Sequence, residues 1–216
     1  QGFAATQAES FEARPVRPSS DQSFAVEENL FKYHAACYLT HAGIDALKKL
    51  KEDHNLKVDQ VEKIEQFVPK THFSVCNIAE PETGLEVKFS MRHTAAMTLA
   101  DVDTGSLHSY SDDIAKRPDL IKLRDRVTII DKPFNSRMQS EVVVHLKDKG
   151  AVHQFSDAGV PESNLDKQET KLIRKFNSLV TPIFGEKTSQ STLDKCLKLE
   201  TLENVADLFN DVTFFK

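Results

Sequence analysis

The fold is decided first by the stretch FKYHAACYLTHAGIDAL, residues 31–47. It places one lysine, two histidines and a cysteine just before or inside a segment with helical periodicity. Small and apolar residues recur at spacings of three and four, which predicts a helix from about residue 37 to residue 52 with one packed face. The residues of that face are Ala36, Leu39, Ala42, Gly43, Ala46, Leu47 and Leu50.

Downstream of this helix, short β-branched and alternating segments predict strands. The strongest are residues 127–130 and 141–146, followed by a turn at 147–150 and a hairpin partner at 152–155. Residues 63–68 are a further predicted strand. Residues 71–78 and 86–90 are also expected to be extended.

Three regions predict additional helices. Residues 90–100 form an alanine-rich pattern for which Ser90 is the natural N-cap. Residues 112–125 are amphipathic, and Pro118 in their first turn would shorten the helix. From residue 164 onward the apolar spacing is helical again. The order of elements predicts an α+β fold, a small mixed sheet with packed helices plus a C-terminal helical segment.

The domain division follows this order. Residues 1–23 are weakly patterned and read as a loose entry segment, residues 24–158 as the α+β domain, and residues 159–216 as C-terminal helices. A chain of 216 residues can bury one substantial core or one domain with a helical appendage.

Composition excludes several classes of function. The net charge of −5 argues against nucleic-acid binding through bulk electrostatics, and no apolar run approaches the roughly 20 residues that span a bilayer. Three widely spaced cysteines form no disulfide framework, so a reducing cytoplasm is the expected compartment. Glycine-rich phosphate loops and the common hydrolase motifs are missing from the sequence.

Two groups of residues carry candidate chemistry, each with a plainer alternative. His34, Cys37 and His41 follow each other at helical spacing and could hold a divalent metal, although a buried thiol with packed histidines fits the same pattern. Lys32 is either a solvated side chain or a point charge for a carboxylate.

The second group is Ser90, Arg92 and His93, at the start of a predicted helix. A helix N-terminus attracts anions, and serine and arginine add donors. His93 is a candidate acid or base because its reference pKa lies near neutrality. A capped surface helix is the alternative interpretation.

Four segments occur in an order that is typical of a known family. Residues 31–46 contain a lysine, then Thr-His and Ile-Asp-Ala; residues 61–101 lead through Thr-Gly and Lys-Phe-Ser into an alanine-rich helix and an aspartate. Residues 137–148 contain an arginine, three valines and Leu-Lys-Asp, and residues 160–176 contain Val-Pro-Glu-Ser-Asn-Leu and Lys-Phe. Over residues 24–185 the chain resembles the second half of the 2-methylcitrate dehydratase and cis-aconitate decarboxylase family, MmgE/PrpD.

The resemblance implies a specific architecture and activity. Residues 24–158 would be the lid-like domain of a cofactor-independent hydro-lyase or decarboxylase acting on a tricarboxylate such as 2-methylcitrate or cis-aconitate. Residues 159–216 would belong to the family's helical domain, whose large N-terminal part would precede Gln1 and carries an aspartate and a histidine for proton transfer. This chain alone is therefore expected to be inactive, and a homodimer is a candidate assembly.

The resemblance also assigns residues. Lys32 corresponds to the lid lysine that faces the substrate, with Ser90 and Arg92 as further binding residues, and His41 corresponds to the histidine of the Thr-His pair. His93 stands where many members have a tyrosine, and this departure leaves the substrate open. His93 and His41 are the candidate catalytic residues, and neither a cofactor nor a metal is expected. Two alternatives remain: a non-enzymatic interaction or carboxylate-binding module, and a metal-binding protein using His34, Cys37 and His41.

Overall fold

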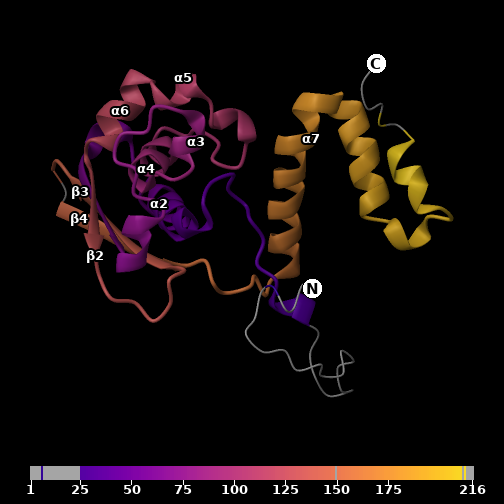
Figure 1. Ribbon diagram of the computed structural model, residues 1–216, viewed down its shortest axis with the longest axis horizontal. Coiled ribbons are helices and arrows are strands. Elements are labelled where there is room, and N and C mark those ends of the chain that lie inside the picture. Colours follow the sequence, from indigo (N-terminus) through magenta and orange to yellow (C-terminus); the bar gives the residue numbers. More distant parts are fainter. Residues whose placement is uncertain (1–5, 7–24, 149, 211, 213–216) are drawn as a thin grey trace.

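The protein consists of an α+β body with a pair of helical segments beside it (Figure 1). The computed structural model describes residue 6, residues 25–148, residues 150–210 and residue 212. The predicted fold class is confirmed: a mixed sheet packs against helices, and a helical segment follows. The predicted entry segment 1–23 lies, apart from Thr6, outside the described residues.

The body is built on a four-stranded sheet with the strand order β2-β1-β3-β4. Strands β1 and β2 are parallel, whereas the β1–β3 and β3–β4 pairs are antiparallel. The long crossover that a parallel pair requires contains the helices between β1 and β2. The strands are β1 (Val61–Val68), β2 (Val127–Asp131), β3 (Gln139–Leu146) and β4 (Gly150–Asp157).

Helices cover one face of this sheet. The 3₁₀ helix η2 (Tyr38–Thr40) leads into α2 (His41–His54), which packs on β3 and β4 and against α4 (Met91–Leu99). Helix α4 in turn contacts β2 and α6 (Pro118–Arg124). The largest fully buried apolar side chains of this core are Ile44, Leu47, Leu50, Ile64, Met91, Met97, Leu99, Leu120, Val61 and Val68.

Most predicted elements are present, with capping as expected. Ser90 caps α4, since its Oγ accepts a hydrogen bond from the His93 backbone N–H at 3.2 Å. Pro118 occupies the first turn of α6 and separates it from α5 (Asp112–Ala115), so the predicted helix over residues 112–125 is divided in two.

Two segments predicted to be extended are largely helix and turn, and only their ends meet, in an isolated antiparallel bridge between Asn77 and Ser90. Residues 71–78 contain the 3₁₀ helix η4 (Lys70–Ser74), and their alternating apolar residues Phe73 and Val75 are exposed. The first two residues of the segment 86–90 belong to α3 (Gly84–Val87). This helix begins with a capping box between Thr83 and Glu86. In both places local hydrogen bonding outweighs an alternating pattern too short to pair with the sheet.

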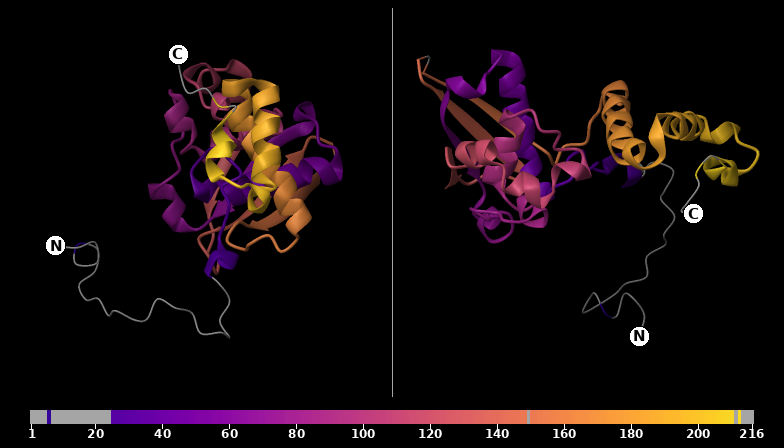
Figure 2. Two further views of the ribbon diagram at one scale, coloured as in Figure 1. Left: turned by 90° about the vertical axis from the view of Figure 1, so that its right-hand side faces the viewer. Right: turned by 90° about the horizontal axis from the view of Figure 1, so that it is seen from above.

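The C-terminal part is a bent helical pair (Figure 2). Helix α7 (Leu165–Cys196) begins at the N-cap Asn164 and changes direction at Gly185, whose φ of 80° is available mainly to glycine. The short helices η6 (Leu199–Thr201) and η7 (Val205–Phe209) follow. None of the described helices has both the length and the apolar character that a membrane crossing needs. The remaining short 3₁₀ helices are η1 (Ala25–Glu28), η3 (Val58–Gln60) and η5 (Leu107–Ser109).

Candidate functional site

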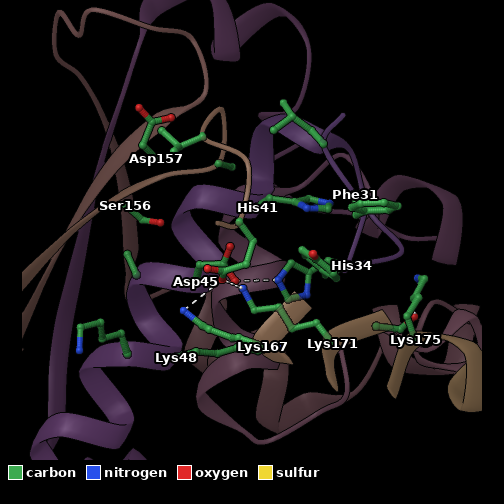
Figure 3. A pocket seen from close by; sticks show the side chains of 18 of the residues that line it. Phe31, His34, His41, Asp45, Lys48, Ser156, Asp157, Lys167, Lys171 and Lys175 are labelled. Carbon is green, nitrogen blue, oxygen red and sulfur yellow. Dashed lines mark hydrogen bonds and ion pairs between the residues drawn. The ribbon is translucent and has the colours of Figure 1, made fainter. Parts of the chain in front are cut away.

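A cavity of about 760 Å³ lies between the α+β body and the first turns of α7 (Figure 3). Five stretches line it: residues 29–34 except Lys32, Tyr38 with the face of α2 between residues 41 and 52, Asp103 with Gly105, residues at the end of β4 and after it between 154 and 163, and the face of α7 between residues 167 and 178. These stretches are far apart in the sequence, so only the fold brings them together. Histidines, carboxylates, lysines and aromatic rings dominate the wall, which suits a polar ligand better than an apolar one.

One wall of the cavity is a stack of three rings. The rings of Tyr38 and His41 lie 4.6 Å apart at an interplanar angle of 29°, and His34 meets His41 edge-on at 4.9 Å. The Tyr38 hydroxyl donates to the Ala158 carbonyl at 2.7 Å, which ties the stack to the segment after β4. The orientation of His41 is therefore fixed from both sides.

His34 uses both of its ring nitrogens inside the protein. Its Nε2 lies 3.0 Å from Asp45 Oδ1, and its Nδ1 lies 2.8 Å from the Thr104 hydroxyl. A neutral imidazole carries one N–H, and the carboxylate can only accept, so Nε2 is the protonated nitrogen and Thr104 donates to Nδ1. Burial lowers the pKa of His34, although the hydrogen bond to Asp45 opposes this effect.

Asp45 reaches the cavity from α2 (Figure 3). Burial raises the pKa of its carboxyl group, but the hydrogen bond from His34 and the charges of His34, His41 and Lys48 together outweigh that effect, and the pKa lies below its ordinary value. Asp45 is therefore a carboxylate at neutral pH, and its side chain is about half exposed.

His41 is buried in the site with one ring nitrogen, Nε2, that lacks a hydrogen-bond partner among the described residues, although the Ala36 backbone acts on the ring. The residue is 2% exposed, and none of the described residues forms a hydrogen bond with its Nε2. Burial lowers the pKa of His41 to about 3, and the charges of His34 and Lys32 act in the same direction. At neutral pH its ring is uncharged.

Lys175 lines the cavity, and Lys32 and Lys88, which are not lining residues, lie close enough to act on its charge. Burial lowers the pKa of Lys175, and among the charges around it those of Lys32 and Lys88 lower it further. Lys175 donates to the Gly105 carbonyl at 2.9 Å, and the Lys88 ammonium lies 5.6 Å from the centre of the Tyr110 ring. Within the described part of the chain, no carboxylate forms an ion pair with any of the three.

Other cations of α7 are neutralised within the protein. Lys167 and Lys171 contact Glu162 at 3.2 and 3.0 Å, and these two ammonium groups lower the pKa of Glu162 to about 2. The Lys171 ammonium also lies 5.0 Å from the centre of the Tyr33 ring, and Arg174 approaches Asp103 at 3.5 Å. These contacts hold α7 against the body. Among the lysines that line the cavity, Lys48 and Lys175 form no ion pair with a carboxylate of the described residues.

The predicted site residues fall into two places. His41 lines the cavity, whereas the exposed Lys32 does not line it but lies close enough for its charge to act on His41. Ser90, Arg92 and His93 are not among the residues that line it. Ser90 is buried as the α4 N-cap, and Arg92 has a buried Nε that no described residue contacts by a hydrogen bond.

His93 is enclosed in the core. Its side chain is fully buried, and neither ring nitrogen has a hydrogen bond of ordinary geometry, although the Ile114 carbonyl lies close enough to act on the ring. Burial lowers the pKa of His93 to about 4. Its assignment as a catalytic residue stays a prediction.

The metal hypothesis is not supported by the geometry. His34 has committed both nitrogens to Asp45 and Thr104, so it has no lone pair free for a ligand bond. Across residues 25–148 and 150–210, no group of three or more His, Cys, Asp or Glu side chains is arranged to hold a metal ion.

Two features of the site were missed from the sequence. The first is the contact of His34 with Asp45, eleven positions apart. His34 lies in the loop before α2, so this contact does not follow from helical spacing. The second feature is the set of lysines on α7. Their spacing of four, from Lys167 through Lys171 to Lys175, was the available signal for one cationic helix face.

The comparisons with known proteins define the class. The family model described as MmgE/PrpD C-terminal domain matches residues 34–199. The comparison with curated proteins gives no match. The matched segment includes the three rings, the sheet and all of α7, so the chain belongs to the MmgE/PrpD family and contains its C-terminal domain.

Proposed function

We propose that this chain is the substrate-closing portion of a cofactor-independent hydro-lyase or decarboxylase that acts on a tricarboxylate such as 2-methylcitrate or cis-aconitate. Family membership supports the enzyme class. The carrying observation is Lys175, which lines the polar cavity, together with Lys32 and Lys88, which lie close enough to lower its pKa. None of these three cations forms an ion pair with a carboxylate of the described residues. A ligand with several carboxylates would neutralise such a cluster.

The chemistry of this class assigns roles to the remaining residues. Elimination of water needs a base for the C–H proton and an acid for the leaving hydroxyl, and a closing domain orients the substrate and excludes water. Lys32 would orient a carboxylate, with Ser90 and Arg92 as further binding residues. His41 and His93 are the candidates for proton transfer. Because the resemblance places other proton-transfer groups in an N-terminal helical part, we expect this chain to bind without turnover. A cytoplasmic location is part of the same proposal.

Calorimetric titration of the chain with citrate, cis-aconitate and 2-methylcitrate tests this proposal. Lys32→Ala should weaken binding on the order of tenfold, about 1.4 kcal/mol, because it removes one charge-assisted contact. Lys116→Ala is the matched control, since Lys116 is exposed at the C-cap of α5 and is not among the cavity-lining residues, so its replacement should leave affinity unchanged. Failure of all three ligands to bind, or equal affinity in both variants, would contradict the proposal.

An apolar groove of about 560 Å³ on α7 supports the assignment of residues 159–216 to a helical domain. Its lining is mainly aliphatic and aromatic, and it runs between the two arms of the bent helix. We propose that the helical domain of the full enzyme covers it, because an exposed apolar patch of this kind marks an interaction site. The apolar lining residues are Leu165, Leu172, Ile173, Phe176, Leu179, Leu193 and Leu197.

The same groove is the observation that favours the alternative, a non-enzymatic interaction module. Light scattering after gel filtration separates the cases. If the unaltered chain forms a dimer and the Phe176→Glu variant is a monomer, the chain associates with itself through this groove. A chain that is monomeric at all concentrations would leave the helical domain as the proposed occupant and remove the homodimer.

A further inference from the structure

We propose that His41 is a ligand-binding residue of the cavity and that its imidazole takes up a proton when a carboxylate of the ligand binds against it. This inference rests on the proposed function, and it adds a specific residue and a specific linkage to it. The ring lies in the wall of the cavity, is almost wholly buried, and its Nε2 has no hydrogen-bond partner among the described residues. A buried polar atom in this state costs roughly 1–3 kcal/mol, which a ligand that bonds to it would recover.

The surrounding geometry selects His41 over its neighbour. His34 lines the same cavity, but Asp45 and Thr104 occupy both of its nitrogens, so it cannot accept a ligand without breaking an internal bond. Tyr38 stacks on one side of His41 and His34 meets the other. Only His41 is therefore both fixed in orientation and free to bond.

Charge explains why binding and protonation are coupled. Several titratable or charged groups surround the ring, from each element that borders it. Lys32 and His34 from the segment before η2 and Asp45 from α2 act on the ring directly. The cavity around it is also lined by Tyr38 from η2, Lys48 from α2, Asp157 from the end of β4 and Lys175 from α7. Burial and the nearby positive charges keep the free ring neutral. A carboxylate within about 4–6 Å would favour the charged form of the ring, because opposite charges in a buried site attract strongly.

Nuclear magnetic resonance of the histidine ring signals measures this directly. In the free chain we expect His41 to remain neutral down to about pH 4, since its pKa is about 3. Saturation with citrate should move its pKa into the range of about 4 to 6, a rise of about 1 to 3. The His41→Gln variant assigns the signal, and the ring signals of exposed His108, which is not among the cavity-lining residues, serve as the control for effects of citrate outside the cavity.

Affinity gives a second readout. If the bound pKa reaches about 6, citrate should bind up to about tenfold more tightly at pH 5 than at pH 7, by the linkage between binding and protonation. Citrate itself ionises over this pH range, so the His41→Gln variant is titrated at both pH values for comparison. This variant should lack the increase in affinity at pH 5 that belongs to His41. Should His41→Gln not fold, the ring titration of the unaltered chain still decides.

The outcomes separate this inference from the proposed function. Citrate binding that depends on Lys32, together with an unchanged His41 titration, would overturn the inference and leave the proposed function standing. Citrate that fails to bind at any pH would overturn both. A third outcome concerns Lys32. If citrate shifts the His41 signal equally in the unaltered chain and in Lys32→Ala, and the two bind citrate with the same affinity, His41 is retained as a binding residue and Lys32 is excluded.

Discussion

Lowering the pH from 8 to 5 should destabilise the fold by about 4 kcal/mol through two buried histidines. In the unfolded chain a histidine has a pKa of about 6.5. In the folded chain burial lowers the pKa of His41 to about 3 and that of His93 to about 4. Below pH 6.5 the unfolded chain therefore binds protons that the folded chain does not, and the free energy of unfolding falls as the pH falls.

The magnitude at pH 5 depends little on the folded pKa values. Each ring stays mostly neutral in the fold at this pH, so the cost is set by the gap of about 1.5 between pH 5 and the unfolded pKa. At 1.36 kcal/mol for each pH unit, this gives about 2 kcal/mol for each histidine. His34 and His72 are also buried with lowered pKa values and act in the same direction. The loss continues until the pH reaches the folded pKa values near 3 and 4.

Urea unfolding followed by circular dichroism at pH 8, 7, 6 and 5 measures this loss. His93→Gln should remove about half of the dependence that the two histidines share, and His41→Gln a similar part, because each variant deletes one proton acceptor of the unfolded state. The exposed His108 provides the control, and His108→Gln should leave the pH dependence as it is. A free energy of unfolding that changes by less than about 1 kcal/mol between pH 8 and pH 5 would refute the reasoning.

Three other substitutions test the local structure by the same unfolding measurement. Ser90→Ala should cost about 1 kcal/mol, because it removes the side-chain cap of α4; a cost below 0.3 kcal/mol, roughly the error of such measurements, would contradict the cap. Lys51→Met should cost about 2 kcal/mol, since the ammonium donates to two carbonyls at the end of α4 and to Asp101 at 2.7 Å. A variant as stable as the unaltered chain at both low and high salt would contradict this role of Lys51. Gly84→Ala should cost about 1–3 kcal/mol by overpacking, as the added Cβ would lie 2.0 Å from the Tyr110 carbonyl oxygen; a neutral result would show that the two loops can separate freely.

The elements that could be predicted from the sequence are those in which one residue pattern dominates. The small-residue face of α2, the cap at Ser90 and the β-branched strands β2 and β3 each agree with burial in the structure. The predicted strand over residues 71–78 failed because alternation over so few residues is also produced by chance in a loop. Pro69 before it and the exposed side chain of Phe73 show that the segment lies outside the sheet.

The site was less predictable because it depends on contacts between distant segments. Lys32 and His41 lie in the stretch that also carries the helix pattern, and the structure places both near one cavity. The role of His34 depends on Thr104, seventy residues away, and the approach of Lys175 depends on the direction of α7. Neither contact has a periodic signal, so composition and spacing could identify the residue types without placing them together.

Buried histidines connect the stability of this fold to its proposed function. His41 and His93 have the same direction of pKa change and the same expected cost in acid, yet only His41 borders the cavity. A carboxylate ligand should therefore reduce the acid-induced loss that belongs to His41 and leave the part that belongs to His93. Measured with saturating citrate, the pH dependence of unfolding should become shallower in the unaltered chain and in His93→Gln, but not in His41→Gln. Mass-action stabilisation by citrate alone would raise stability at every pH in all three proteins, so the change in slope distinguishes proton-coupled binding from simple binding.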